Sequence, residues 1–214
     1  PALNGKGMWK GLWDSLKEME TSLLSQDGFG DYQTDLVRYL LGMSNVPPDQ
    51  KHYQDYQYFY KIRHDIVHAA VCTDWGLPFG ELPVGEILKT VDPEVLEKMN
   101  AEPRNKYVLR QTPDIVMMNH PRMLVDVAVG TDINLRVKSK LGSYHQLKLS
   151  LEAAMKALGR ENPTFEIIPL VFRDTNTRTD QYAHRLTGGI RRIIKLCLDR
   201  AAEELIRIHN TIDG

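Results

Sequence analysis

Two aspartates in the middle of the chain are the side chains best suited to chemistry. Asp114 directly follows Pro113, and Asp126 comes twelve residues later in an apolar run. The segment between them predicts a strand, a turn and a second strand, and folding that hairpin would bring both carboxylates to one end of a sheet. Carboxylate oxygens are the ligands that Mg²⁺ and Mn²⁺ prefer. The pair therefore predicts a divalent-metal site of the kind that cleaves phosphodiesters.

The alternative is that both aspartates are structural, Asp114 bonding within a turn and Asp126 facing solvent from a half-buried strand. The neighbours of Asp126 favour a functional role, because they are Leu124, Val125, Val127 and Val129. A carboxylate in a strand that is buried on both faces is costly unless it is paired or bound to a metal.

The pattern of Pro113-Asp114 followed by Asp126 is similar to that of the PD-(D/E)xK nuclease superfamily. The usual lysine two residues after the second acidic residue is absent, since position 128 is alanine. At about 100° per residue, a helix expected after the hairpin places Lys140 on the same side as its apolar stripe. Lys140 is therefore predicted to supply the missing ammonium, unless its stem merely covers apolar surface with its head in solvent.

A histidine is the remaining candidate ligand. His64 lies at the edge of the apolar stripe of a helix expected over 54–73, and His68 follows at i+4. Two histidines at this spacing suggest zinc, yet no thiolate or third histidine completes such a site. One imidazole joined to two carboxylates fits manganese better.

The composition excludes several classes of protein. The 214 residues carry 27 basic and 28 acidic side chains, so nucleic-acid binding must come from a local patch rather than from net charge. The two cysteines, Cys72 and Cys197, fall in expected helices and are predicted to be unpaired core residues of a protein from a reducing compartment. No apolar run approaches the roughly 20 residues that cross a bilayer. Because the chain opens on Pro1, we expect it to be one part of a longer protein.

The periodicity predicts an α/β (α+β) fold in two lobes: a helical N-terminal lobe, and a small twisted mixed β-sheet surrounded by helices. We expect one endonuclease-sized domain over 1–214, in which 1–75 is mainly helical, 76–106 is a loop-rich connection with one or two short helices, 107–175 holds the sheet and the active-site helix, and 176–214 forms C-terminal helices. Within these parts the expected helices span 8–24, 31–43, 54–73, 135–158 and 181–208, the last with a candidate interruption at 188–189, and the expected strands span 115–118, 123–129 and 165–172.

Several short segments resemble one viral family. Three segments resemble the N-terminal endonuclease domain of the large polymerase protein of bunyaviruses, most closely the hantaviral type. They are Arg63-His64-Asp65-Ile66-Val67 with Asp74-Trp75, Thr112-Pro113-Asp114, and Val125-Asp126-Val127-Ala128-Val129. The resemblance covers roughly residues 64–151. Two departures are Asp126, where hantaviruses carry glutamate, and Ser143, where a second lysine is expected.

The resemblance implies roles for particular residues. His64, Asp114, Asp126 and the backbone carbonyl of Val127 would bind one or two Mn²⁺ ions, with Mg²⁺ a weaker alternative. Lys140 would be catalytic beside Asp114 and Asp126. Three further basic residues are candidate substrate contacts, namely Lys138, Lys148 and Arg136.

The activity that the resemblance implies is cap-snatching, in which a manganese-preferring endoribonuclease cleaves capped host messenger RNA to make primers for viral transcription. The partners would be single-stranded or capped RNA and the remainder of an RNA-dependent RNA polymerase protein, in the host cytoplasm and in the virion, with no membrane. The isolated domain is expected to be monomeric. Two alternatives stay open: a DNA nuclease of the PD-(D/E)xK group, and a catalytically silent interaction module of a polymerase.

Overall fold

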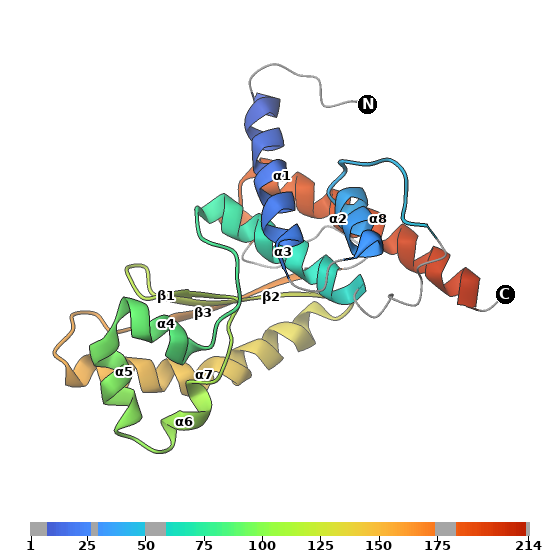
Figure 1. Ribbon diagram of the computed structural model, residues 1–214. Coiled ribbons are helices and arrows are strands. Elements are labelled where there is room, and N and C mark those ends of the chain that lie inside the picture. Colours follow the sequence, from blue (N-terminus) through green and yellow to red (C-terminus); the bar gives the residue numbers. More distant parts are fainter. Residues whose placement is uncertain (1–7, 27–29, 50–58, 174–182, 213–214) are drawn as a thin grey trace. The chain divides into compact units, whose positions relative to one another are not determined.

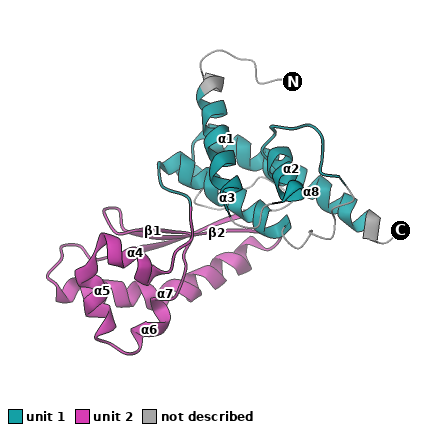
Figure 2. Ribbon diagram, in the orientation of Figure 1, with its two compact units in different colours: residues 1–79, 173–214 teal, residues 80–172 magenta. Residues whose placement is uncertain are grey.

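The fold comprises two compact units, which Figure 2 colours separately. The computed structural model describes residues 8–26, 30–49, 59–173 and 183–212. The first unit combines residues 1–79 with 173–214, and the second is the continuous segment 80–172. The C-terminal helix thus belongs with the N-terminal helices, and the boundary falls inside the loop-rich connection expected over 76–106.

The described part of the first unit is helical, as predicted for the N-terminal third (Figure 1). Helix α3 (Phe59–Trp75) is so apolar that most of its side chains are buried, including Ile66, Val67 and Cys72. Cys72 and Cys197 are free and buried, as expected of core thiols. The helices of this unit are α1 (Met8–Leu24), α2 (Asp31–Leu40), α3 (Phe59–Trp75) and α8 (Gly188–Ile212), preceded by a short 3-10 turn at Ala183–Arg185.

Two helix ends in this unit differ from the sequence-based expectation. Helix α2 ends at Leu40 rather than Met43, because Gly42 takes a positive φ of 75° and Met43 N–H bonds back to the carbonyl of Arg38. Helix α8 begins at Gly188, so the glycine pair marks a start and not an interruption. The Asp74 carboxylate accepts hydrogen bonds from the N–H and hydroxyl of Thr187 just before this start. Residues 54–58 and 181–182 of the expected helices lie outside the described residues.

The second unit contains a small mixed sheet with helices packed on it (Figure 1). Strand β2 is central in the order β1-β2-β3, and β1 pairs with it antiparallel, with Ile115 opposite Val125. The α/β fold with a small sheet is confirmed. The elements of this unit are α4 (Val84–Val91), α5 (Pro93–Asn100), α6 (Asn105–Val108), β1 (Ile115–Met117), β2 (Met123–Gly130), α7 (Ile133–Ala157) and β3 (Glu166–Arg173).

Helix α7 connects β2 to β3. The part of the predicted apolar stripe from Tyr144 onward is buried, whereas Leu141, which was expected on the same stripe, is 39% exposed. The N-terminus of α7 is capped by Asp132, whose carboxylate accepts the N–H of Leu135 at 2.9 Å. Tyr144, Leu147 and Leu151 are buried in one cluster with side chains of α4, α5, β2 and the segment before β3. This packing fixes the rotation of α7 about its axis, and with it the direction of the polar side chains on the same face. No described helix is long and apolar enough to cross a membrane.

Candidate functional site

The central feature of the second unit is the buried carboxylate of Asp126 on β2. Only 2% of the residue is exposed, as its apolar neighbours predicted. Lys140 Nζ of α7 lies 2.5 Å from Asp126 Oδ2, and the Tyr144 hydroxyl donates a hydrogen bond of 2.6 Å to Asp126 Oδ1. Lys140 and Tyr144 are one helical turn apart and therefore face the strand together. The structure thus brings an ammonium and a phenol to the strand carboxylate.

Asp114 stands beside Asp126 because of the hairpin register. Ile115 pairs with Val125, so continuing the ladder by one residue places Asp114 opposite Asp126. Asp114 is 8% exposed, and its Oδ2 accepts a 2.5 Å hydrogen bond from the N–H of Val127. This bond holds the carboxylate against the central strand. The predicted hairpin therefore gathers both aspartates as expected.

The electrostatics of this pair favour a cation. Burial raises the pKa of Asp126, the nearby Asp114 carboxylate raises it further, and Lys140 and Tyr144 offset only part of that rise. Burial also raises the pKa of Tyr144, followed by the effects of Asp126, Asp114 and Glu81. Two carboxylates that repel each other in a buried site are stabilised by a bound metal ion.

Glu81 is a further acidic residue of this unit, and it was not among the predicted site residues. It lies in the segment before α4, and a ligand oxygen of its exposed side chain is within 4.8 Å of one of Asp114. The sequence signal was weak, because a lone glutamate between Gly80 and Pro83 is typical of any polar loop. Only tertiary structure shows that this loop passes the aspartate pair.

In the first unit, His64 lies half-buried on α3, next to a fully buried carboxylate. His64 Nδ1 lies 3.3 Å from Asp65 Oδ1, and Asp65 Oδ2 also pairs with Lys61. Burial raises the pKa of Asp65, but the hydrogen bonds from His64 and Lys61 outweigh burial and leave that pKa below its usual value. An Nδ1–H donated to Asp65 leaves Nε2 of His64 as the ligand atom.

His68, one turn after His64, is a core residue. It is completely buried, and its ring centroid lies 4.9 Å from that of Phe79. The two rings are tilted by 60° to each other, so the imidazole packs against an aromatic side chain in the core.

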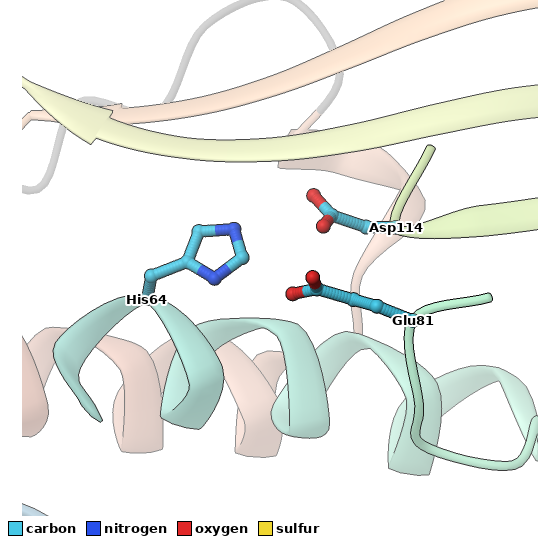
Figure 3. A group of neighbouring side chains, drawn as sticks. All are labelled: His64, Glu81 and Asp114. Atoms are coloured by element: carbon cyan, nitrogen blue, oxygen red, sulfur yellow. The ribbon is translucent and has the colours of Figure 1, made fainter. Parts of the chain in front are cut away.

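One set of described side chains carries ligand atoms suited to a metal ion, namely His64 of the first unit with Glu81 and Asp114 of the second, which Figure 3 draws as sticks. An imidazole nitrogen with carboxylate oxygens suits a divalent metal of intermediate hardness. Asp126, which was predicted as a ligand, is not in this set, because its carboxylate contacts Lys140 and Tyr144. Its metal-binding role, and that of the Val127 carbonyl, stay predictions.

The three predicted substrate contacts have different surroundings. Lys138 is exposed on α7. The Arg136 side chain lies over Gly130, where an added Cβ would stand 3.1 Å from Arg136 Nε, so that glycine leaves room for it. Lys148 lies 3.7 Å from Glu152 and is only partly exposed.

Comparison with known proteins adds no family assignment: no family model matches the chain, and no curated protein matches its sequence significantly.

Proposed function

We propose that the chain is a metal-dependent endoribonuclease whose reaction centre is built around Asp114, Asp126 and Lys140. The observation that carries the proposal is the buried contact of Asp126 with Lys140, next to a second carboxylate on the paired strand. Two carboxylates and an ammonium are the groups that metal-assisted phosphodiester cleavage needs. Tyr144 holds the strand carboxylate in place from the same helix face.

Donor chemistry supports manganese as the metal. In this proposal Glu81 and Asp114 supply carboxylate oxygens and His64 supplies one nitrogen, a mixture that suits Mn²⁺ better than Mg²⁺ and lacks the thiolates common in structural zinc sites. When bound, such an ion supplies a water of lowered pKa and neutralises charge on the phosphate. We propose one or two ions, with Mg²⁺ as a weaker substitute and with Asp126 and the Val127 carbonyl as further ligands.

The chain's own groups have separate roles in this scheme. Lys140, with its side chain 30% exposed, places a positive charge at the edge of a site that is otherwise acidic. Such a charge stabilises the extra negative charge that develops on the phosphate in the transition state. Asp114 is held by the N–H of Val127 and therefore presents its carboxylate in a fixed orientation.

The resemblance of the segments around His64, Asp114 and Asp126 to bunyaviral polymerase endonucleases supports a more specific proposal. In it, the substrate is single-stranded, capped messenger RNA, and the cleaved fragment primes viral transcription. The rest of a polymerase protein and the host cytoplasm belong to that same proposal. Base preference is expected to be weak, because contacts to phosphates carry no sequence information.

Cleavage of a labelled single-stranded RNA in Mn²⁺ tests the proposal, using the whole chain, Lys140→Ala and the control Lys156→Ala on an exposed position of α7. We expect Lys140→Ala to cut on the order of 100-fold more slowly, with Lys156→Ala unchanged. Equal rates for Lys140→Ala and wild type would contradict the assignment of Lys140.

A duplex DNA of the same length provides the second arm of this experiment. Faster cleavage of duplex DNA than of RNA would favour a PD-(D/E)xK DNA nuclease. No cleavage of either substrate and no binding of Mn²⁺ would favour a silent interaction module.

A further inference from the structure

An open groove with both apolar and polar side chains lies in the second unit, on a different face of α7 from Lys140 and Tyr144. It has a volume of about 630 Å³ and is bounded by the turn of the β1-β2 hairpin, the middle of α7 and the start of β3. The polar side chains that line it include His120, Arg122, His145, Lys148 and Glu166. We call it the hairpin groove. Neither the carboxylates nor the lysine of the proposed reaction centre line it.

Arg122 is the most constrained cation of the hairpin groove. Its Nη1 donates to the backbone carbonyls of Glu161 and Asn162 and lies 2.8 Å from His120 Nε2. Its Nε is buried without a hydrogen-bond partner, and no carboxylate of the described residues lies within 4.0 Å of the guanidinium. The side chain is therefore held rigidly by neutral acceptors while its charge is not neutralised, a state that favours an anion nearby.

The histidines of the hairpin groove add donors. Because His120 Nε2 accepts from Arg122, the neutral ring of His120 carries its proton on Nδ1 and can donate from there. His145 is exposed on α7, one turn before the lysine that completes the set.

Lys148 has only a loose ion pair. Its Nζ lies 3.7 Å from Glu152 Oε1, and that oxygen also accepts the N–H of Phe165 at 2.7 Å. The groove is therefore lined by two permanent cations, Arg122 and Lys148, against the single carboxylate of Glu166. The backbone on either side of the groove is joined by a hydrogen bond, which Glu166 N–H donates to the carbonyl of Arg122 at 3.0 Å.

We propose that the hairpin groove binds a backbone phosphate of the single-stranded RNA, a proposal that rests on the endoribonuclease function above. A guanidinium bonds a phosphate through paired N–H groups, and a lysine adds charge without demanding a fixed geometry. Lys140 and Lys148 are eight residues apart on α7, which is about 12 Å along the axis. The phosphate in the groove is thus a different one from the scissile phosphate, and it anchors the strand beside the reaction centre.

Binding of a labelled, single-stranded RNA to the whole chain, measured by fluorescence anisotropy in EDTA over a range of salt, tests this proposal without cleavage. The variants are Arg122→Gln, Lys148→Gln and the double variant, with Lys156→Gln as the control on the same helix. We expect several-fold weaker binding for each single variant, and a slope of log K against log salt that falls by about 0.7 for each lost phosphate contact. Lys156→Gln should leave both quantities unchanged.

An unchanged dissociation constant and salt slope for the double variant would contradict phosphate binding by the groove. An equal loss of RNA affinity in Lys156→Gln would also contradict it, because it would show that only general electrostatic attraction is at work. If Arg122→Gln lowers the melting temperature because it releases Glu161 and Asn162, Lys148→Gln and His145→Gln carry the test. Cleavage of the same RNA in Mn²⁺ is measured in parallel. A raised KM with unchanged kcat in the groove variants supports phosphate binding by the groove. A wild-type chain that binds RNA but never cleaves it would contradict the proposed function and not the groove.

Discussion

Two buried aspartates, one in each unit, make an instructive comparison. Asp65 on α3 is 1% exposed and Asp126 on β2 is 2% exposed, and each pairs with a lysine. Burial acts on both, yet the pKa of Asp65 ends below its usual value and that of Asp126 ends above it. Burial alone therefore does not decide the charge of either group.

The difference comes from the second neighbour of each carboxylate. Asp65 has His64 and Lys61 as donors, so its negative charge is compensated within its own helix. Asp126 has Lys140 and Tyr144, but it also has the Asp114 carboxylate across the ladder. We infer that Asp65 orients the imidazole of His64, whereas the negative charge of the Asp114 and Asp126 pair is only partly compensated and favours a bound metal ion.

The largest effect should come from the strand carboxylate. Asp126→Asn keeps the shape and an acceptor for Tyr144 but removes the charge, so we expect RNA cleavage in Mn²⁺ to fall by about 100-fold or more. The matched control is Asp199→Asn, because Asp199 is exposed on α8 and pairs with Lys195. Steady-state cleavage rates of the two variants, each normalised to wild type, measure the effect. A similar small loss of rate in both variants would show that the charge of Asp126 has no special role in cleavage.

A smaller effect is expected at Asp65. Asp65→Asn weakens the acceptor that orients His64, and loss of such an orienting partner typically lowers metal affinity by about 10- to 100-fold. Lys61→Gln is the control, since it removes the other partner of Asp65 and leaves the contact with His64. Mn²⁺ titration of both variants checks this, and equal affinities in Asp65→Asn and wild type would show that Asp65 is only structural.

Tyr144 tests how firmly Asp126 is held. Tyr144→Phe deletes the 2.6 Å hydrogen bond and leaves one oxygen of Asp126 without that donor, at a cost of about 1–3 kcal/mol in folding stability. Thermal melting in EDTA measures the loss. The exposed Tyr107 provides a control, Tyr107→Phe, for which no change is expected; equal melting of the two variants would mean that the bond contributes nothing.

The smallest effect concerns a buried carboxyl of the first unit that is not among the proposed ligands. Glu204 on α8 is completely buried, and burial raises its pKa despite the opposing effect of Arg207. Its folded pKa exceeds the unfolded one, so its stabilising contribution is present below the unfolded value near 4.5 and is lost as pH rises through the raised value.

Glu204→Gln should remove this dependence. We expect the melting temperature of the variant minus that of wild type to grow as pH rises from about 4.5 towards neutrality, by a few degrees in a protein of this size. Glu203→Gln, at an exposed neighbouring position, is the control. A difference that stays flat with pH would show that burial does not set the titration of Glu204.

Much of the second unit could be predicted from sequence because its signals are local. The β-prone run around Asp126 predicted β2, and the helical period of α7 placed Lys140 on the buried side of that helix. Both patterns are read within one element and depend only on the period of its side chains. The hairpin then followed from the short turn between two strands.

Contacts between distant segments were harder to predict. Glu81 approaches Asp114 only because the segment before α4 passes the start of β1, and a lone loop glutamate carries no periodic signal. The hairpin groove joins a turn, a helix and a strand start that are separated by tens of residues. The sequence identified Asp65 only as part of a motif. Its proposed role in orienting His64 follows from the positions of its two donors, His64 and Lys61.

Calorimetric titration of the whole chain with Mn²⁺, after treatment with EDTA, tests the central claim most directly. Asp114 is the residue to vary, because it is one of the proposed metal ligands and also belongs to the buried aspartate pair. We predict saturable binding by wild type, a melting temperature that rises with Mn²⁺ concentration, and loss of both in Asp114→Asn. No binding heat from wild type, or the same affinity in Asp114→Asn, would contradict the account.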